Sequence, residues 1–176
     1  AALERLTGDL EPSPEEGITP FPRTKKEKVA IIGSGPAGLT AARNLVTMCY
    51  GVTIFEDLPV AGGMLAVGIP EYRLPKKVLE TQIEGIKRLG VEIKLKRRLG
   101  KDLTVNALWK QGYQAIFLAT GARSSMKLDI PGETLKGIYA GVFFLRDVNL
   151  GKKVKVGNRV AVVGGGNAAI DAARTA

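Results

Sequence analysis

Histidine is absent from the 176 residues, and cysteine occurs once, as Cys49. Without histidine the chain lacks the side chain most used for proton transfer near neutral pH and the commonest metal ligand. A single cysteine excludes an internal disulfide or a cysteine-ligated cluster within these residues. We therefore expect no metal site in this chain and assign no catalytic acid or base. A bound organic cofactor that carries the chemistry is compatible with both absences.

Aromatic residues are also scarce, at 6%, and no apolar run approaches the ~18 residues of a membrane span. The net charge of +9 is concentrated in two basic runs, within residues 94–101 and 152–155. Because aromatics do not interleave with these runs, the pattern disfavours nucleic-acid binding. It favours a solvated face, or a surface for anionic cofactors or an acidic partner. The first 16 residues do not resemble a signal peptide, so we expect a cytoplasmic location.

Two glycine-rich turns begin at residues 33 and 164, each directly after a short apolar run. The first reads Gly33-Ser34-Gly35-Pro36-Ala37-Gly38, and the second Gly164-Gly165-Gly166-Asn167-Ala168-Ala169. In such a fingerprint the first glycine permits a tight turn, the second lets the backbone approach a pyrophosphate, and the third allows helix–strand packing. The helix that follows directs its N-terminus at the phosphates. Two fingerprints suggest a resident cofactor and a second dinucleotide that exchanges electrons with it.

An acidic residue follows the first fingerprint at the expected place. Glu56 comes 18 residues after Gly38, at the end of the next apolar run, where a carboxylate accepts hydrogen bonds from a ribose diol. These features are common to FAD and NAD sites. The paired glycines Gly62 and Gly63 would let backbone approach the cofactor beyond its adenosine. Arg73 could bind a phosphate or a flavin carbonyl, or form a surface ion pair with a glutamate.

Apolar periodicity predicts alternating strands and helices, hence a doubly wound, Rossmann-like α/β fold. The expected strands cover residues 29–32, 52–55, 91–95 and 115–119. The expected helices cover 38–49, 75–89, 104–110, capped by Thr104, and 140–149. Residues 160–176 are predicted to form the strand, turn and helix that open a second unit.

Four segments together resemble the pyridine nucleotide oxidoreductase module of the glutamate synthase small (beta) subunit family. They read GSGPAG, FED-x-x-x-x-GGM-x-x-x-GIPEYRLPK, ATGA and VVGGGNAAIDAARTA. The module is also similar to the flavin domain of dihydropyrimidine dehydrogenase and to NADH-dependent ferredoxin-NADP transhydrogenase subunits. The resemblance extends from about residue 2 to residue 176, and the GIPEYRLPK segment makes it more specific than a Rossmann motif alone.

The resemblance implies a domain organisation. Residues 1–28 are an extended approach segment, and residues 29–122 an incomplete FAD-binding domain. Residues 123–137 are a crossover, and residues 138–176 begin a truncated NAD(P)-binding domain. Family members carry a cysteine-rich iron–sulfur domain upstream and continue past the second fingerprint. The chain is therefore expected to be part of a longer polypeptide and inactive alone.

The resemblance also implies cofactor-binding residues. Residues 33–38 would hold the FAD pyrophosphate, with Glu56 on the adenosine ribose and Asp57 beside it. Gly62, Gly63 and Met64 would line the flavin side, with Arg73 near the flavin or pyrophosphate. Leu99 would contact the adenine. Thr120 and Gly121 would lie where the chain runs past the cofactor into the second domain. The pyrophosphate of NAD(P)H would lie at Gly164, Gly165, Gly166, Asn167 and Ala168.

The implied function is electron transfer from NAD(P)H through FAD to iron–sulfur clusters outside this chain, on a larger catalytic subunit or an iron–sulfur domain. A glutamate synthase small chain is the leading form. Another reductase built on the module, either a transhydrogenase or a pyrimidine-reducing enzyme, is an alternative. A nucleotide-binding or assembly fragment without turnover is the other. Ala169, in place of a third glycine, favours NADP only weakly, so NAD and NADP both stay open.

Overall fold

A four-stranded parallel sheet forms the centre of the computed structural model, which describes residues 19–122 and 124–176. The strands are β1 (Lys28–Ile32), β2 (Gly51–Phe55), β3 (Glu92–Lys94) and β4 (Ala115–Leu118), in the order β3-β2-β1-β4. The parallel α/β fold predicted from the sequence is confirmed. Of the predicted approach segment, residues 1–18 lie outside the described residues.

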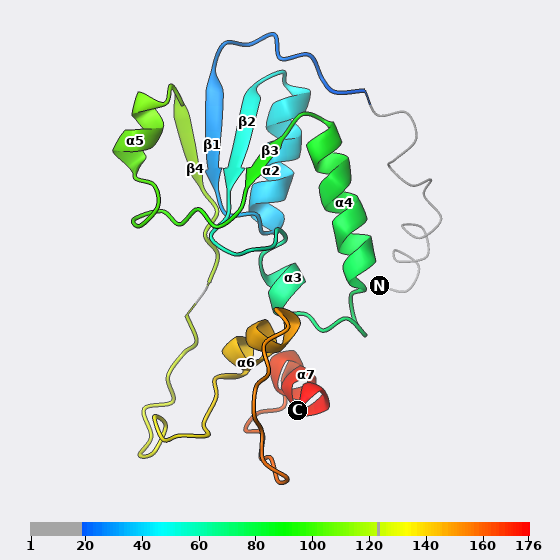
Figure 1. Cartoon of the computed structure of the whole chain (residues 1–176), viewed down its shortest axis with the longest axis vertical. Helices are drawn as coiled ribbons and strands as arrows, with labels where there is room; N and C mark the ends of the chain where they lie inside the picture. The colour runs from blue at the N-terminus through cyan, green and yellow to red at the C-terminus, as the bar shows by residue number, and fades with distance from the viewer. Residues whose placement is uncertain (1–18, 123) are drawn as a thin grey trace.

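Six helices of the described chain connect or follow these strands (Figure 1). They are α2 (Pro36–Thr47), α3 (Met64–Val67), α4 (Lys76–Arg88), α5 (Val105–Lys110), α6 (Gly141–Asn149) and α7 (Asn167–Thr175). Figure 1 shows α6 and α7 beyond the end of the sheet, with α6 next to α3 and α7 beside α6. No helix in the described ranges is long and apolar enough to cross a membrane.

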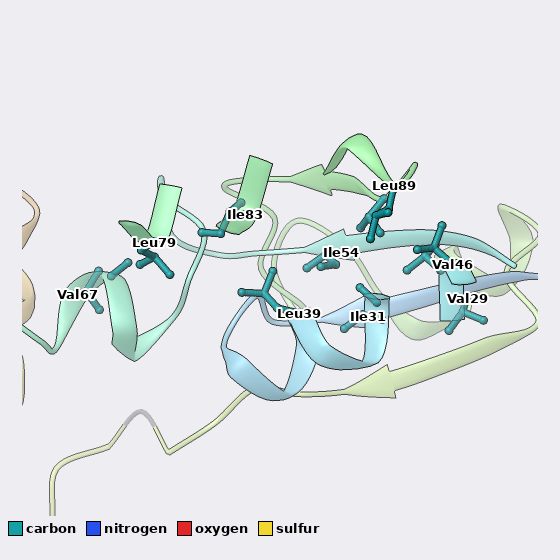
Figure 2. Packing of buried hydrophobic residues seen from close by; sticks show 13 residues of the cluster. Val29, Ile31, Leu39, Val46, Ile54, Val67, Leu79, Ile83 and Leu89 are labelled. Carbon is teal, nitrogen blue, oxygen red and sulfur yellow. The ribbon is translucent and has the colours of Figure 1, made fainter. Parts of the chain in front are cut away.

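The two faces of the sheet are covered by different helices. Ile31 and Ile54 are fully buried on the face covered by α2 and α4, where Leu39 and Ile83 pack against them (Figure 2). The neighbouring residue Ala30 points to the opposite face, because successive side chains of a strand alternate. That face is covered by α5 and the segments around it, with Leu103, Leu108 and Tyr113 in its core.

The strand order places a crevice at one end of the sheet. From β1 the chain moves outward to β2 and β3, then returns to the other side of β1 as β4. Such a reversal leaves the carboxyl ends of β1 and β4 diverging, which is where open α/β sheets bind ligands. The first fingerprint follows β1 and Glu56 follows β2, so both lie at this end.

The helix predicted at 104–110 begins as its sequence indicates. The Oγ1 of Thr104 accepts a hydrogen bond from the backbone N–H of Ala107 at 3.1 Å, and Leu108 in the same helix is fully buried. In the full-length protein, Thr104→Ala should lower the local opening free energy of α5 by about 1 kcal/mol, the usual value of an N-cap. Faster amide hydrogen exchange confined to α5 would show this. Thr104→Ser keeps the acceptor and serves as the control, so equal exchange in the two variants would contradict the role of the cap.

The prediction of a strand at residues 160–163 was wrong. These residues have no strand conformation, and Val160, Val162 and Val163 are 50%, 39% and 87% exposed. A strand needs a neighbour to satisfy its backbone groups, and all four strands in the described part of the chain belong to the sheet of the first unit. The helix predicted after this segment does form, as α7.

Candidate functional site

The first fingerprint forms a narrow turn between β1 and α2. Gly33 has a φ of +110°, and a Cβ there would collide with the carbonyl oxygen of Ala119 at the end of β4. A Cβ on Gly38 would collide with the carbonyl oxygen of Gly33. The predicted turn and packing roles of these two glycines therefore have a direct steric cause.

Gly35 differs from both neighbouring glycines, because an added Cβ would meet nothing within 4 Å. It is the N-cap of α2, and no side chain caps this end of the helix. The first turn of a helix leaves backbone N–H groups without intrahelical partners and carries the positive end of the helix dipole. The open space at Gly35 is therefore a place for an anion.

A cavity of about 600 Å³ opens at this turn, within the range typical of ligand sites. It lies at the carboxyl ends of β1, β2 and β4, as the strand order requires. Eleven of the predicted residues line it: Gly33, Gly35, Pro36, Ala37, Glu56, Asp57, Gly63, Met64, Leu99, Thr120 and Gly121. Segments far apart in the sequence thus meet around one cavity.

Glu56 is buried, and protein donors already hold its carboxylate. Oε2 accepts hydrogen bonds from the backbone N–H and the hydroxyl of Ser34, at 2.9 and 2.6 Å. Oε1 accepts one from the backbone N–H of Leu58 at 2.9 Å. Since Glu56 also lines the cavity, it combines a structural role with a position open to a ligand.

Ser34 and Gly62 do not line the cavity; they support it. Ser34 is fully buried, and its hydroxyl oxygen also accepts a hydrogen bond from the backbone N–H of Gly62 at 3.1 Å. Gly62 packs on Leu79, 2.9 Å from the position of an added Cβ, whereas Gly63 lies against the Cα of Gly35 at 2.8 Å from such a position. The hydrogen bonds that join Glu56 to Ser34 and Ser34 to Gly62 thus hold the loop in which Gly63 faces the cavity.

Two arginines of the basic run also line the cavity, although the sequence singled out neither. Arg97 and Arg98 flank the predicted residue Leu99, and Nε of Arg98 lies 3.8 Å from an Oδ of Asp57. From its composition, this run could be a solvated face, or a surface for anionic cofactors or an acidic partner. The two side chains bring positive charge to the cavity.

Helix α6, in the second unit, contributes part of the cavity wall. Val142, Phe143 and Arg146 line it, and the guanidinium of Arg146 lies 4.9 Å from the centre of the Phe143 ring. Nε of Arg146 also donates to Asp147 at 3.2 Å. Hydrogen bonds from Lys152 and from Arg146 lower the pKa of Asp147. The sequence predicted this helix but gave no sign that it would reach the first site.

Arg73 lies away from the cavity. Its Nε donates to an Oδ of Asp171, on α7, at 2.5 Å, and the hydroxyl of Tyr72 donates to the same oxygen at 2.7 Å. The predicted alternative of an ion pair is what the structure contains, although the partner is a buried aspartate of the second unit. Sequence reasoning gave Asp171 no role.

The second fingerprint is exposed, and none of its residues Gly164, Gly165, Gly166, Asn167 and Ala168 lines the 600 Å³ cavity. Gly166 is the N-cap of α7, and no side chain caps this helix either. An added Cβ on Gly165 or Gly166 would meet nothing within 4 Å. The turn therefore repeats the open, uncapped helix start of the first fingerprint at a separate place.

Comparison with known proteins identifies a family model, described as pyridine nucleotide-disulphide oxidoreductase, that matches residues 27–176. The NADP(+)-dependent formate dehydrogenase subunit beta of Moorella thermoacetica is 54% identical over 156 residues, covering 87% of this chain and 22% of that subunit. The glutamate synthase (NADPH) small chain of Halomonas elongata is 39% identical over 160 residues, covering 85% of this chain and 34% of that one.

A solved structure with a similar fold is that of 2-naphthoyl-CoA reductase in complex with 2-naphthoyl-CoA. It has a TM-score of 0.70 at 28% identity, and the match covers 97% of this chain and 24% of the reductase. The chain thus spans between about a fifth and a third of the length of these three proteins.

Proposed function

The chain belongs to the pyridine nucleotide-disulphide oxidoreductase family, and we propose that it carries the FAD site and the start of the NADPH site of an electron-transfer subunit. Electrons from NADPH leave through FAD to iron–sulfur clusters on another domain or a partner subunit. This proposal rests on the cavity at the carboxyl ends of β1, β2 and β4. The glycine turn before α2 lines this cavity, has free space at Gly35, and has no side chain that caps the helix.

The residues around the cavity fit the parts of FAD. The space at Gly35 and the N-terminus of α2 suit a pyrophosphate, which a Cβ at Gly35 would displace. Glu56 faces the cavity one strand away and suits the ribose diol. Leu99 offers an apolar surface for the adenine, and the rest of the wall includes Gly63, Met64, Thr120 and Gly121.

Each group has a role in holding the cofactor. The backbone N–H groups of Gly35 and Ala37 would donate hydrogen bonds to phosphate oxygens, because those of Gly33 and Ser34 are bonded to Phe55 and Glu56 and Pro36 has none. Glu56 would accept hydrogen bonds from the ribose hydroxyls. Arg97 and Arg98 lower the energy of a dianionic ligand at this edge. Val142, Phe143 and Arg146 of helix α6 form part of the cavity wall. FAD, when bound, supplies the ability to take two electrons from a reduced pyridine nucleotide and to release them one at a time.

NADPH is assigned to the second fingerprint. The uncapped start of α7 at Gly166 offers the same anion-binding feature as α2. The printed names of the formate dehydrogenase and glutamate synthase relatives specify NADP(+) or NADPH, which supports NADP over NAD. A substrate that must leave also suits the exposed turn at the start of α7.

The proposed function also includes the kind of enzyme to which the partner subunit belongs. The identity of 54% to a formate dehydrogenase subunit against 39% to a glutamate synthase small chain favours a formate dehydrogenase-type partner over the glutamate synthase form that the motifs first suggested. Purification of the native complex separates the two, because one forms NADPH from formate and NADP+ and the other forms glutamate at the expense of NADPH. A complex with neither activity would overturn both assignments.

The cofactor itself is tested on the purified full-length protein. Heat should release one FAD per chain, identified by chromatography against FMN and FAD standards. FMN, or no flavin, would contradict the assignment of the cavity. Flavin that NADPH does not reduce would favour a binding or assembly module without turnover.

Glu56 provides a further prediction. Glu56→Ala should weaken FAD binding by about 1–3 kcal/mol, since it removes hydrogen bonds to a charged group. It should also destabilise the apoprotein, because the N–H groups of Ser34 and Leu58 lose their acceptor. Titration of FAD into the deflavinated full-length protein, at a temperature where thermal denaturation shows it folded, separates the two effects. Reduced apoprotein stability with unchanged FAD affinity would leave Glu56 only its structural role.

A further inference from the structure

A buried aspartate joins the two units of the chain. Asp171 lies on α7 and is only 5% exposed. One of its carboxylate oxygens accepts hydrogen bonds from the hydroxyl of Tyr72 at 2.7 Å and from Nε of Arg73 at 2.5 Å. Both donors belong to the loop between α3 and α4, almost one hundred residues earlier in the sequence.

A second contact from the same helix holds this loop. The guanidinium of Arg174 lies 3.9 Å from the centre of the Tyr72 ring, a distance at which a cation is attracted by the ring face. Asp171 and Arg174 are three residues apart and therefore lie on one face of α7. Tyr72 is thus bound through both its hydroxyl and its ring by a single helix.

The charge of Asp171 depends on these partners. Burial alone would raise the pKa of Asp171, but the hydrogen bonds from Arg73 and Tyr72 hold it below its ordinary value. Since an ordinary aspartate has a pKa of about 3.9, the carboxylate is ionised at neutral pH. A buried ionised carboxylate is unfavourable unless it is paired, so α7 is stable in this position only when Asp171 faces the two donors.

The Tyr72–Arg73 loop and helix α7, which meet at Asp171, are each close to a different proposed nucleotide site. The Tyr72–Arg73 loop follows α3, whose residues Met64 and Val67 line the cavity. The helix α7 begins at Asn167, about 6 Å from Asp171 at 1.5 Å per residue. Figure 1 shows α7 beside α6, and α6 in turn next to the end of α3.

We propose that Asp171 is a positioning residue: its contacts with Tyr72 and Arg73 hold α7 against the α3–α4 loop and so fix the N-terminus of α7 relative to the cavity. The inference rests on the proposed function, which places NADPH at that N-terminus and FAD in the cavity. Asp171 itself does not line the cavity and lies outside the second fingerprint.

The test compares full-length proteins containing FAD. Asp171→Asn removes the negative charge but keeps an acceptor oxygen and the side-chain shape. At saturating NADPH it should reduce FAD roughly 10- to 100-fold more slowly in stopped flow, the size of effect that small misplacements of reactants produce. FAD content and the rate of reduction by dithionite, which needs no nucleotide site, should be unchanged.

Two further variants accompany it. Tyr72→Phe removes only the hydroxyl that reaches Asp171, and should slow reduction in the same direction while the ring contact with Arg174 remains. Glu84→Gln breaks an exposed ion pair with Lys87 on α4 and should leave every rate unchanged. If Asp171→Asn does not fold, Tyr72→Phe decides the question alone.

Amide hydrogen exchange gives a readout that does not depend on turnover. In Asp171→Asn, exchange should increase in α7 and in the Tyr72–Arg73 loop together, and in Glu84→Gln in neither. If Asp171→Asn reduces its FAD at the wild-type rate and shows wild-type amide exchange, the positioning role is wrong. Loss of FAD from this variant would also overturn it. A wild-type protein whose FAD is not reduced by NADPH would instead overturn the proposed function, and the exchange data would still decide whether Asp171 holds α7.

Discussion

Full-length protein carrying Gly35→Val should be folded and colourless, with no FAD retained. The backbone at Gly35 has an ordinary φ of −70°, and an added Cβ meets nothing within 4 Å, so the fold tolerates a side chain there. The same space is where the pyrophosphate is assigned, and a branched side chain would occupy it. The flavin absorbance and the circular dichroism spectrum of the purified variant measure the two outcomes.

Gly157→Val is the matched control for this experiment. Gly157 does not line the cavity, has no positive φ, and would place its Cβ about as far from any neighbour, 4.0 Å from the carbonyl oxygen of Arg159. It should retain FAD fully. A Gly35→Val protein with full flavin occupancy would show that the first fingerprint does not hold the cofactor.

The second large effect is expected at the other fingerprint. Gly166→Leu should raise the KM for NADPH strongly or stop reduction of the flavin, while the protein stays yellow. Gly166 has a φ of −79° and open space around an added Cβ, so the leucine projects where the nucleotide phosphates are assigned. Steady-state kinetics with an artificial electron acceptor and the FAD absorbance of the same sample measure both properties.

Gly157→Leu again supplies the control and should change neither. Loss of FAD from Gly166→Leu, with normal binding of NADPH, would mean that the two sites have been assigned the wrong way round. The experiments at Gly35 and Gly166 together therefore test whether the first fingerprint binds FAD and the second binds NADPH.

Local patterns predicted the first unit well. Short apolar runs predicted β1, β2 and β4, and the alternating segment at residues 91–95 predicted β3. The structure places each strand within a residue or two of its predicted range. The packing role of Gly38 and the cap at Thr104 depend on neighbours close in sequence. The tight turn at Gly33 follows from its positive φ, although the atom that a Cβ there would meet belongs to Ala119, far along the chain. Helix α3 was not predicted, since four residues are too few for a helical period to be visible.

The predictions that failed depend on contacts across the chain. Residues 160–163 have the composition of a strand, but no strand in the described residues pairs with them. The position of Arg146 at the cavity and the pairing of Arg73 with Asp171 follow from how α6 and α7 pack on the first unit. Neither contact has a signal in local periodicity, because each joins segments separated by long stretches of sequence.

The most direct measurement is an anaerobic titration of the purified full-length protein with NADPH, followed by flavin absorbance. If FAD occupies the first site and NADPH reaches it from the second, about one NADPH per FAD should bleach the band near its visible maximum, as dithionite does. A protein that holds FAD bleached by dithionite but unaffected by excess NADPH and NADH would contradict the account.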